Sequence, residues 1–248
     1  MRGIAFAVFV LAAAPAFGAD LPTTKSPPSP PVATAYSWTG GYVGVEAGYG
    51  SVGETLTYLS TNGFAVDPPG TTYNTNRNGF LGGFDAGYNY QVGQFVLGAE
   101  GDFNFTRIKG ESVTNSILFP TAGVTIYDYG KTDWYGTLTG RAGVALDAAL
   151  LYAKGGAAWS QQEYGASVTI TGLAPTIYPN FDDTRVGWTI GAGIEYAFSR
   201  NVSAFAEYDY LDFGTKTYFI TDTTGTTHTT YSAKTDASVA KVGLNYRF

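Results

Sequence analysis

Eight stretches of this chain alternate between apolar and polar residues with a period of two, the spacing of side chains on the two faces of a β-strand. The last seven residues show the pattern most clearly, with Val242, Leu244, Tyr246 and Phe248 on one face. The predicted strands are 39–50, 78–90, 95–106, 133–145, 150–160, 185–197, 202–213 and 236–248. Each exceeds the about 5–6 residues of an ordinary strand and reaches the about 9–11 that a tilted transmembrane strand needs.

The connections between these strands alternate in length. Residues 91–94, 146–149 and 198–201 are predicted tight turns. The segments 51–77, 107–132, 161–184 and 214–235 are long, polar and rich in Thr, Asn, Gly, Asp and Pro, and they are predicted loops. Short turns at one rim and long loops at the other are typical of outer-membrane barrels, whose short turns face the periplasm.

The placement of aromatic residues favours a membrane barrel over a water-soluble one. Phe95, Tyr196 and Phe198 fall at the short-turn rim, whereas Phe105 and Trp188 fall at the other end of the predicted strands. Two aromatic girdles around a thin apolar band are what a bilayer selects. The sequence therefore predicts an all-β fold, an eight-stranded antiparallel transmembrane up-and-down β-barrel with short periplasmic turns and four long extracellular loops.

The amino-terminal region precedes this barrel. Arg2 and the apolar run from Ile4 to Ala14 predict a signal peptide over residues 1–18, cleaved after Gly18 or after Ala19. Residues 19–37 are a predicted Pro-rich disordered periplasmic leader, and residues 38–248 are the predicted barrel. The chain has 248 residues, no cysteine and a net charge of -6, which argues against a nucleic-acid partner.

Charged residues recur on the face opposite the apolar one, which we expect to line the lumen. A Lys or Arg that faces mid-bilayer lipid costs about 2–4 kcal/mol, so these residues belong inside. They are Glu46, Asp85, Glu100, Asp102, Arg141, Lys154, Glu195, Glu207, Asp209 and Lys241, joined near the periplasmic rim by Arg247. One interpretation is a plug of ion pairs, because eight strands leave little more than room for side chains. The other is a narrow cation-preferring conduit, because acids outnumber bases.

Signatures of catalysis are weak. Glu207 and Asp209 form a carboxylate pair, but acid–base chemistry also needs a cleft and a shifted pKa. His228, in the Thr-rich segment 214–235, is the only histidine, and there is no cysteine. The Gly191–Gly193 pattern lies within a strand rather than before a helix, unlike a dinucleotide-binding motif. We therefore expect no catalytic residue, no cofactor and no metal site.

The strands together resemble a known family. The matching segments are Ser37–Gly44, Gly79–Gly98, Trp134–Trp159, Gly187–Gly214 and Val242–Phe248. In these the chain resembles the small porin-family surface antigens of alphaproteobacteria, the outer-membrane immunogenic proteins related to opacity-type proteins. The resemblance implies insertion into the Gram-negative outer membrane by the barrel assembly machinery, which reads a terminal aromatic signal, here Tyr246 and Phe248. It implies no single activity.

Three functions remain open at this point. The first is a non-enzymatic barrel that contributes to envelope structure and surface interaction, with outer-membrane lipid and lipopolysaccharide as partners. The second is a narrow porin-like channel for small solutes. The third is a haem- or host-binding surface protein that acts through its extracellular loops, with His228 and the loop aromatics as candidates. A lipid-modifying enzyme is a distant fourth, since only His228 could serve as its base.

Overall fold

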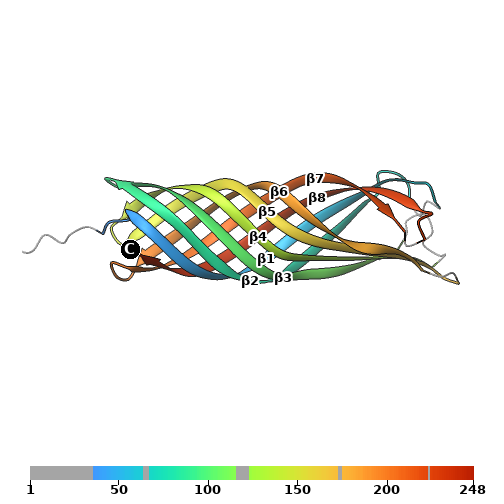
Figure 1. Cartoon of the computed structure of the whole chain (residues 1–248), viewed down its shortest axis with the longest axis horizontal. Helices are drawn as coiled ribbons and strands as arrows, with labels where there is room; N and C mark the ends of the chain where they lie inside the picture. The colour runs from blue at the N-terminus through green and yellow to red at the C-terminus, as the bar shows by residue number, and fades with distance from the viewer. Residues whose placement is uncertain (1–35, 64–66, 116–122, 173–174, 223) are drawn as a thin grey trace, which may run out of the picture. The chain divides into compact units, whose positions relative to one another are not determined.

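Eight strands form one closed antiparallel barrel, in which each strand pairs with the next and β8 pairs with β1 (Figure 1). The computed structural model describes residues 36–63, 67–115, 123–172, 175–222 and 224–248. The predicted signal peptide and almost all of the predicted leader lie outside the described residues. The strands are β1 (Gly40–Thr61), β2 (Thr72–Val92), β3 (Phe95–Asn115), β4 (Val124–Leu146), β5 (Ala149–Ile170), β6 (Thr176–Ala197), β7 (Val202–Thr221) and β8 (His228–Arg247). In the described part of the chain, no helix has the length and apolar character to cross a bilayer.

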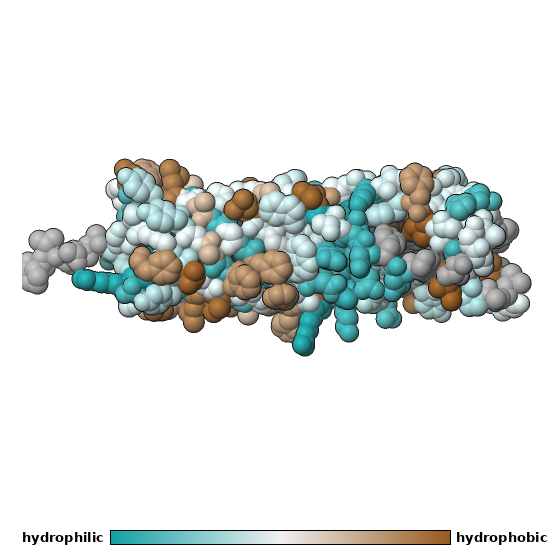
Figure 2. Space-filling model, in the orientation of Figure 1, coloured by the Kyte–Doolittle hydropathy of each residue, from teal (hydrophilic) through white to brown (hydrophobic). Residues whose placement is uncertain are grey.

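The predicted alternation of faces is confirmed. On β3, Phe95, Leu97 and Phe105 are 59–61% exposed, while Val96 and Glu100 between them are buried. The closing strand follows the same rule, since Val242 and Leu244 are exposed whereas Lys241 and Asn245 are buried. Figure 2 shows brown side chains over the part of the wall nearer the carboxyl-terminal end and teal side chains beyond its middle. We call the end that holds the C-terminus and the three short turns the inner end, and the opposite end the outer end.

The four segments predicted as long loops are mostly strand, and that prediction is wrong in extent. Each strand has 20–23 residues, because the ladders continue about ten residues beyond the predicted boundaries. The connections at the outer end shrink to residues 62–71, 116–123, 171–175 and 222–227. The segments predicted as loops are rich in Thr and Tyr, which suit strands. Most of their outward positions are polar, because these parts of the strands extend beyond the lipid. A spanning strand needs only about 9–11 residues, so the barrel continues well past the bilayer.

The wall of the barrel opens along two seams in its outer half. Among the described residues, the β2–β3 ladder ends at the Asn78–Lys109 pair, and the β6–β7 ladder ends at the Trp188–Asp212 pair. The other six ladders continue to the outer hairpins or nearly so. The outer half is therefore two facing four-stranded sheets, β7-β8-β1-β2 and β3-β4-β5-β6. Figure 1 shows the blue and red strands separating from the green and yellow ones toward that end.

A local irregularity in β7 marks the start of the second seam. The β7–β8 register shifts between Asp212 and Thr215, and Gly214 takes a φ of 65°. That backbone conformation suits glycine, which has no Cβ to clash. A bulge of this kind bends a strand and ends its pairing on one side. β7 thus leaves β6 beyond Asp212 and continues past Gly214 with β8 alone.

Candidate functional site: the filled lumen

The structure places all ten predicted lumen residues inside the barrel. Each of them is at most 6% exposed. Nine of them, all but Asp85, are brought together with Arg247 into one inner charged cluster, which comprises Glu46, Glu100, Asp102, Arg141, Lys154, Glu195, Glu207, Asp209, Lys241 and Arg247. Asp85 is buried beside this cluster and makes no ion pair with any described residue.

Two lysines organise the centre of the inner charged cluster. The Nζ of Lys154, on β5, lies 2.6 Å from Glu207 Oε1 and 2.8 Å from Glu100 Oε1. The Nζ of Lys241, on β8, lies 3.1 Å from both Glu207 Oε1 and Asp209 Oδ2. Glu207 on β7 contacts both lysines, and Lys154 also contacts Glu100 on β3, so the network links strands on opposite sides of the barrel. Such a network fills the lumen with fixed, mutually compensating charges.

Arginine and aromatic side chains close the cluster toward the inner end. Arg141 donates to Glu195 Oε2 at 3.0 Å, and its guanidinium carbon lies 3.8 Å from the centroid of the Tyr152 ring. Arg247 donates to the carbonyl of Trp38 and approaches Glu195 Oε1 at 3.4 Å. Trp38 is fully buried in an apolar group with Val96, Ala145, Leu150, Tyr152 and Ala197. This group seals the lumen at the inner end.

Asp85 is the exception to the pairing of lumen charges. Both of its carboxylate oxygens are buried without a hydrogen-bond partner, as is Asn245 Oδ1. The two residues crowd the same place, because a Cβ added to Gly44 would lie 2.3 Å from Asp85 Oδ1 and 2.0 Å from Asn245 Oδ1. Two oxygen acceptors without a donor between them destabilise the fold.

Asp85→Asn is therefore expected to raise the free energy of unfolding by about 1–2 kcal/mol, because an amide loses the uncompensated charge and supplies a donor. Equilibrium unfolding in urea from lipid vesicles measures this change. Asp102→Asn is the matched control and should destabilise, since Asp102 accepts from Thr137 at 2.6 Å and lies 3.4 Å from Lys154 Nζ. A lower stability for Asp85→Asn would contradict the assignment of an unpaired carboxylate.

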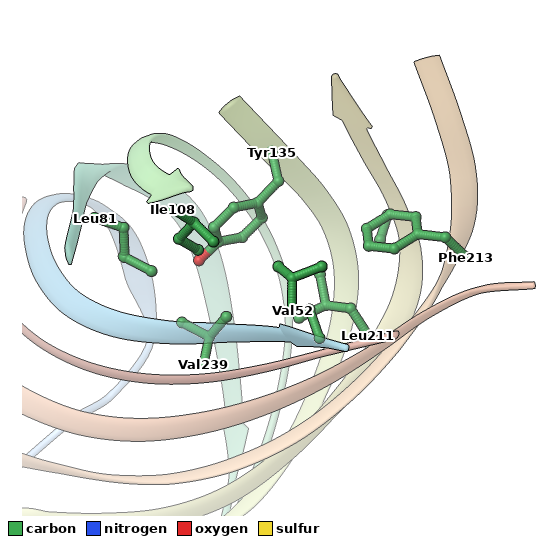
Figure 3. Close-up of a cluster of buried hydrophobic side chains, with 9 residues drawn as sticks. Val52, Leu81, Ile108, Tyr135, Leu211, Phe213 and Val239 are labelled. Atoms are coloured by element: carbon green, nitrogen blue, oxygen red, sulfur yellow. The ribbon is translucent and has the colours of Figure 1, made fainter. Parts of the chain in front are cut away.

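An apolar belt crosses the lumen beyond the inner charged cluster. It consists of Val52, Leu81, Ile108, Tyr135, Ala158, Leu211, Phe213, Ala237 and Val239. Figure 3 shows its labelled side chains directed into the space enclosed by the strands. On β2 the belt residue Leu81 lies between inward-facing Asp85 and Arg77, so the belt separates two polar layers. The alternation of faces predicts apolar residues only toward lipid, and this inward apolar layer is an addition that the structure shows.

A second, smaller charged layer lies beyond the apolar belt. Arg77 pairs with Glu54 inside the β7-β8-β1-β2 sheet, and its guanidinium carbon lies 5.4 Å from the Tyr164 ring of the facing sheet. A Cβ on Gly130 would lie 1.1 Å from Arg77 Nη1, so the absence of a side chain there makes room for the arginine. Arg77 thereby spans the β2–β3 seam.

Arg185 bridges the other seam, between β6 and β7. From β6 it donates to Tyr218 Oη at 2.7 Å and to the Gly214 carbonyl at 3.1 Å, both on β7. It also donates to the Ala233 carbonyl at 3.1 Å and to Thr235 Oγ1 at 3.0 Å, both on β8. Each open seam is thus bridged by one buried arginine.

The comparisons with known proteins agree with this architecture. The family model described as outer membrane protein beta-barrel domain matches residues 4–248. The chain belongs to this family. It is 33% identical over 237 residues to the 31 kDa outer-membrane immunogenic protein of Brucella melitensis, covering 94% of this chain and 93% of that protein. It is 32% identical over 259 residues to the 25 kDa outer-membrane immunogenic protein of Brucella abortus, with both chains fully covered.

A further relative and a solved structure complete the comparison. The 22 kDa outer membrane protein of Rhizobium leguminosarum is 28% identical, with 88% of this chain and 82% of that protein covered. The outer membrane protease OmpT from Escherichia coli matches with a TM-score of 0.52 and 10% identity, over 86% of this chain and 98% of that one, which shows the fold alone. The predicted family, the eight-stranded barrel and the outer-membrane location are thereby confirmed. As in other members of such barrel families, the short turns face the periplasm and the outer end is extracellular.

At the extracellular end, apolar side chains are exposed on the outside of two sheets whose facing sides are packed together. Tyr58, Tyr73 and Ile126 are buried between the two sheets, with Leu56, Val168 and Tyr231 against them. Large apolar side chains that point outward near the tips are Phe219 (82% exposed), Val113 (61%), Ile177 (52%), Tyr127 (46%) and Leu59 (39%). His228, the candidate ligand of the loop hypothesis, is exposed, and its Nδ1 lies 2.9 Å from Thr221 Oγ1. Within the described residues no group of three or more His, Cys, Asp or Glu side chains is arranged for a metal ion.

Asp222 fixes the extracellular turn between β7 and β8. It accepts from the Thr224 hydroxyl at 2.7 Å, from the Thr227 amide at 3.2 Å and from the Thr226 amide at 2.9 Å. These donors lower the pKa of Asp222 to about 2. Because the folded pKa is depressed below the about 3.9 of a free aspartate, the turn is fully stabilised above that value and loses this support as pH falls through about 2.

The Thr226 and Thr227 amide chemical shifts are therefore expected to titrate with a midpoint near pH 2, as followed by NMR of the protein in micelles. Asp222→Asn should abolish that titration. A midpoint near the free value of about 3.9 would show that these hydrogen bonds do not form in solution.

Proposed function

We propose that the protein is a non-enzymatic, closed barrel that stabilises the outer membrane and presents a binding surface at its extracellular tips. The apolar belt carries this proposal. A conducting pore needs a continuous polar or wetted path, and a hydrophobic constriction excludes water from such a path. The belt lies between two layers of paired charges, and a plug of this kind fits the narrow interior of eight strands.

The channel hypothesis draws its support from the acidic inner face. Those acids, however, lie against Lys154, Lys241, Arg141 and Arg247, so ion pairs balance most of their negative charge. Enzymatic chemistry has less support still, because the similar proteins of Brucella carry names of immunogenic proteins rather than of enzymes. The observations favour a filled barrel over either alternative.

The surface role is supported by the exposed tips. Phe219, Val113 and Ile177 point outward from two facing sheets whose interior is packed, so a rigid scaffold presents them. Exposed apolar residues on such a scaffold are typical of binding surfaces. The partner class here is a protein or small-molecule ligand at the cell surface, which includes the host-partner and haem hypotheses.

A deletion strain tests the envelope role against the channel role. Loss of the gene is expected to increase sensitivity to SDS with EDTA, while uptake of small hydrophilic solutes stays unchanged. Complementation with the intact gene should restore resistance, and a version with Phe219→Ser and Ile177→Ser should restore it equally, because the tips lie outside the bilayer. Slower solute uptake with unchanged detergent resistance would instead support the channel.

A further inference from the structure

Two cations stand on the outward face of β3 just beyond its last lipid-facing aromatic residue. Arg107 and Lys109 follow Phe105 at a spacing of two, and all three side chains are exposed. Aromatic girdles mark the level of the lipid headgroups, so the two cations stand at the headgroup layer of the outer leaflet. Among the described residues neither Arg107 nor Lys109 has an ion pair or a side-chain hydrogen bond.

The neighbouring strand adds a third cation rather than a counter-charge. Lys109 lies directly opposite Lys131 in the β3–β4 ladder. Like charges in such a cross-strand pair destabilise a sheet unless something compensates them. Lys131 has its own compensation, since its Nζ lies 3.0 Å from Asp133 Oδ1 and 3.1 Å from Glu163 Oε2. The charges of Arg107 and Lys109 are therefore left for an external anion.

A hollow in the wall adjoins the two cations. It has a volume of about 500 Å³ and is lined by Phe80, Leu81, Gly82, Phe105, Thr106 and Arg107. It forms where the β2–β3 ladder has no pair between Leu81–Thr106 and Asn78–Lys109, and where the β3–β4 register shifts between Phe105 and Ile108. Such bulges redirect side chains, and here the irregularity leaves an apolar recess directly below a basic pair.

We propose that Arg107 and Lys109 bind the phosphates of the phosphorylated glycolipid of the outer leaflet, lipopolysaccharide, while an acyl chain lies in the hollow. Guanidinium and ammonium groups bind phosphate through charge-assisted hydrogen bonds. The charge match is local, because the protein carries a net charge of -6 and a broad attraction for anions is absent. The apolar recess explains why a lipid rather than a free anion fits. The inference rests on the outer-membrane location and is independent of whether the lumen conducts.

Binding of diphosphoryl lipid A to the purified full-length protein in zwitterionic micelles tests the proposal. Arg107→Ser with Lys109→Ser is expected to weaken binding about thirtyfold, the loss of two phosphate contacts. The charge-conserving double variant Arg107→Lys with Lys109→Arg should keep most of the affinity. The matched control is Lys234→Ser, because Lys234 is also exposed and has no ion pair with any residue that the structure describes, but lies on β8, away from the hollow.

Two further probes separate the sources of phosphate. Dephosphorylated lipid A should bind as weakly to the intact protein as lipid A binds to the double serine variant. Inorganic phosphate should compete poorly, because it cannot occupy the hollow. Heat-modifiable gel migration verifies that each variant is folded. Unchanged binding by the double serine variant, an equal loss with Lys234→Ser, or full competition by inorganic phosphate would each overturn the proposal.

Discussion

Lys241→Met is expected to lower the free energy of unfolding by about 3–5 kcal/mol, the cost of breaking a buried ion-pair network by removing one partner. The Nζ of Lys241 is fully buried and lies within 3.1–3.5 Å of carboxylate oxygens of Glu46, Asp102, Glu207 and Asp209. Methionine fills a similar volume but leaves Asp102, Glu207 and Asp209 to share Lys154 with Glu100. Among the described residues it also leaves Glu46 without an ion pair. Urea unfolding of the barrel reconstituted in lipid vesicles measures the change.

Two companion variants make this result specific. Lys234→Met, on the same strand but exposed, should change stability by no more than about 0.5 kcal/mol. Adding Asp209→Asn to Lys241→Met should recover part of the loss, because one uncompensated carboxylate is then removed. A loss below about 1 kcal/mol for Lys241→Met, or no recovery in the double variant, would contradict the idea that Lys241 holds the cluster together.

Arg185→Met is expected to loosen the extracellular half selectively and to lower the free energy of unfolding by about 3 kcal/mol. The guanidinium is buried and donates to β7 and β8 across a seam that has no backbone ladder. Removing one partner from a buried network of charged groups costs about 3–5 kcal/mol, and the bonds of Arg185 to neutral acceptors place the expected loss at the lower end. Hydrogen exchange should accelerate in residues 182–187 and 213–221 and stay slow in 189–197 and 202–211.

The exposed ion pair at the same seam is the control for Arg185. Lys216, whose side chain is 49% exposed, pairs with Asp183, and Lys216→Met should therefore cost at most about 1 kcal/mol. Uniformly faster exchange throughout the barrel after Arg185→Met would mean that the two halves unfold as one unit. Unchanged exchange at the seam would mean that Arg185 does not bridge it.

The membrane-spanning part of this protein could be predicted from its sequence because lipid requires the apolar face of every strand to point outward. Phe95 to Phe105 and Val242 to Phe248 place apolar residues outward, and the charged positions between them followed directly. Beyond the bilayer that rule fails, since water lies outside the wall. There Asn74 and Asn76 point outward while Tyr73 and Arg77 point inward. The sequence of this stretch therefore resembles that of a polar loop.

The alternation of inward and outward positions along each strand could have extended the predicted strands beyond the bilayer. Glu54 and Val52 share the inward parity of Glu46, and Arg77 shares that of Asp85. Oppositely charged inward residues at Glu54 and Arg77 indicate a continued ladder. The two seams could not be predicted in this way, because they depend on where neighbouring strands diverge. Gly214, which marks one of them, is one of many glycines in the chain. The function of Tyr246 and Phe248 as an assembly signal stays a prediction.

Single-channel recording of the purified protein in planar lipid bilayers tests the closed lumen most directly. A closed lumen should give no steady conductance above the bare bilayer at moderate voltage and salt, because the apolar belt separates the two charged layers. Replacing belt residues Val52, Leu81 and Val239 together with serine should allow water into this layer and produce small currents. Steady cation-selective openings from the unmodified protein, reduced by Glu100→Gln with Glu207→Gln, would show that the lumen is open.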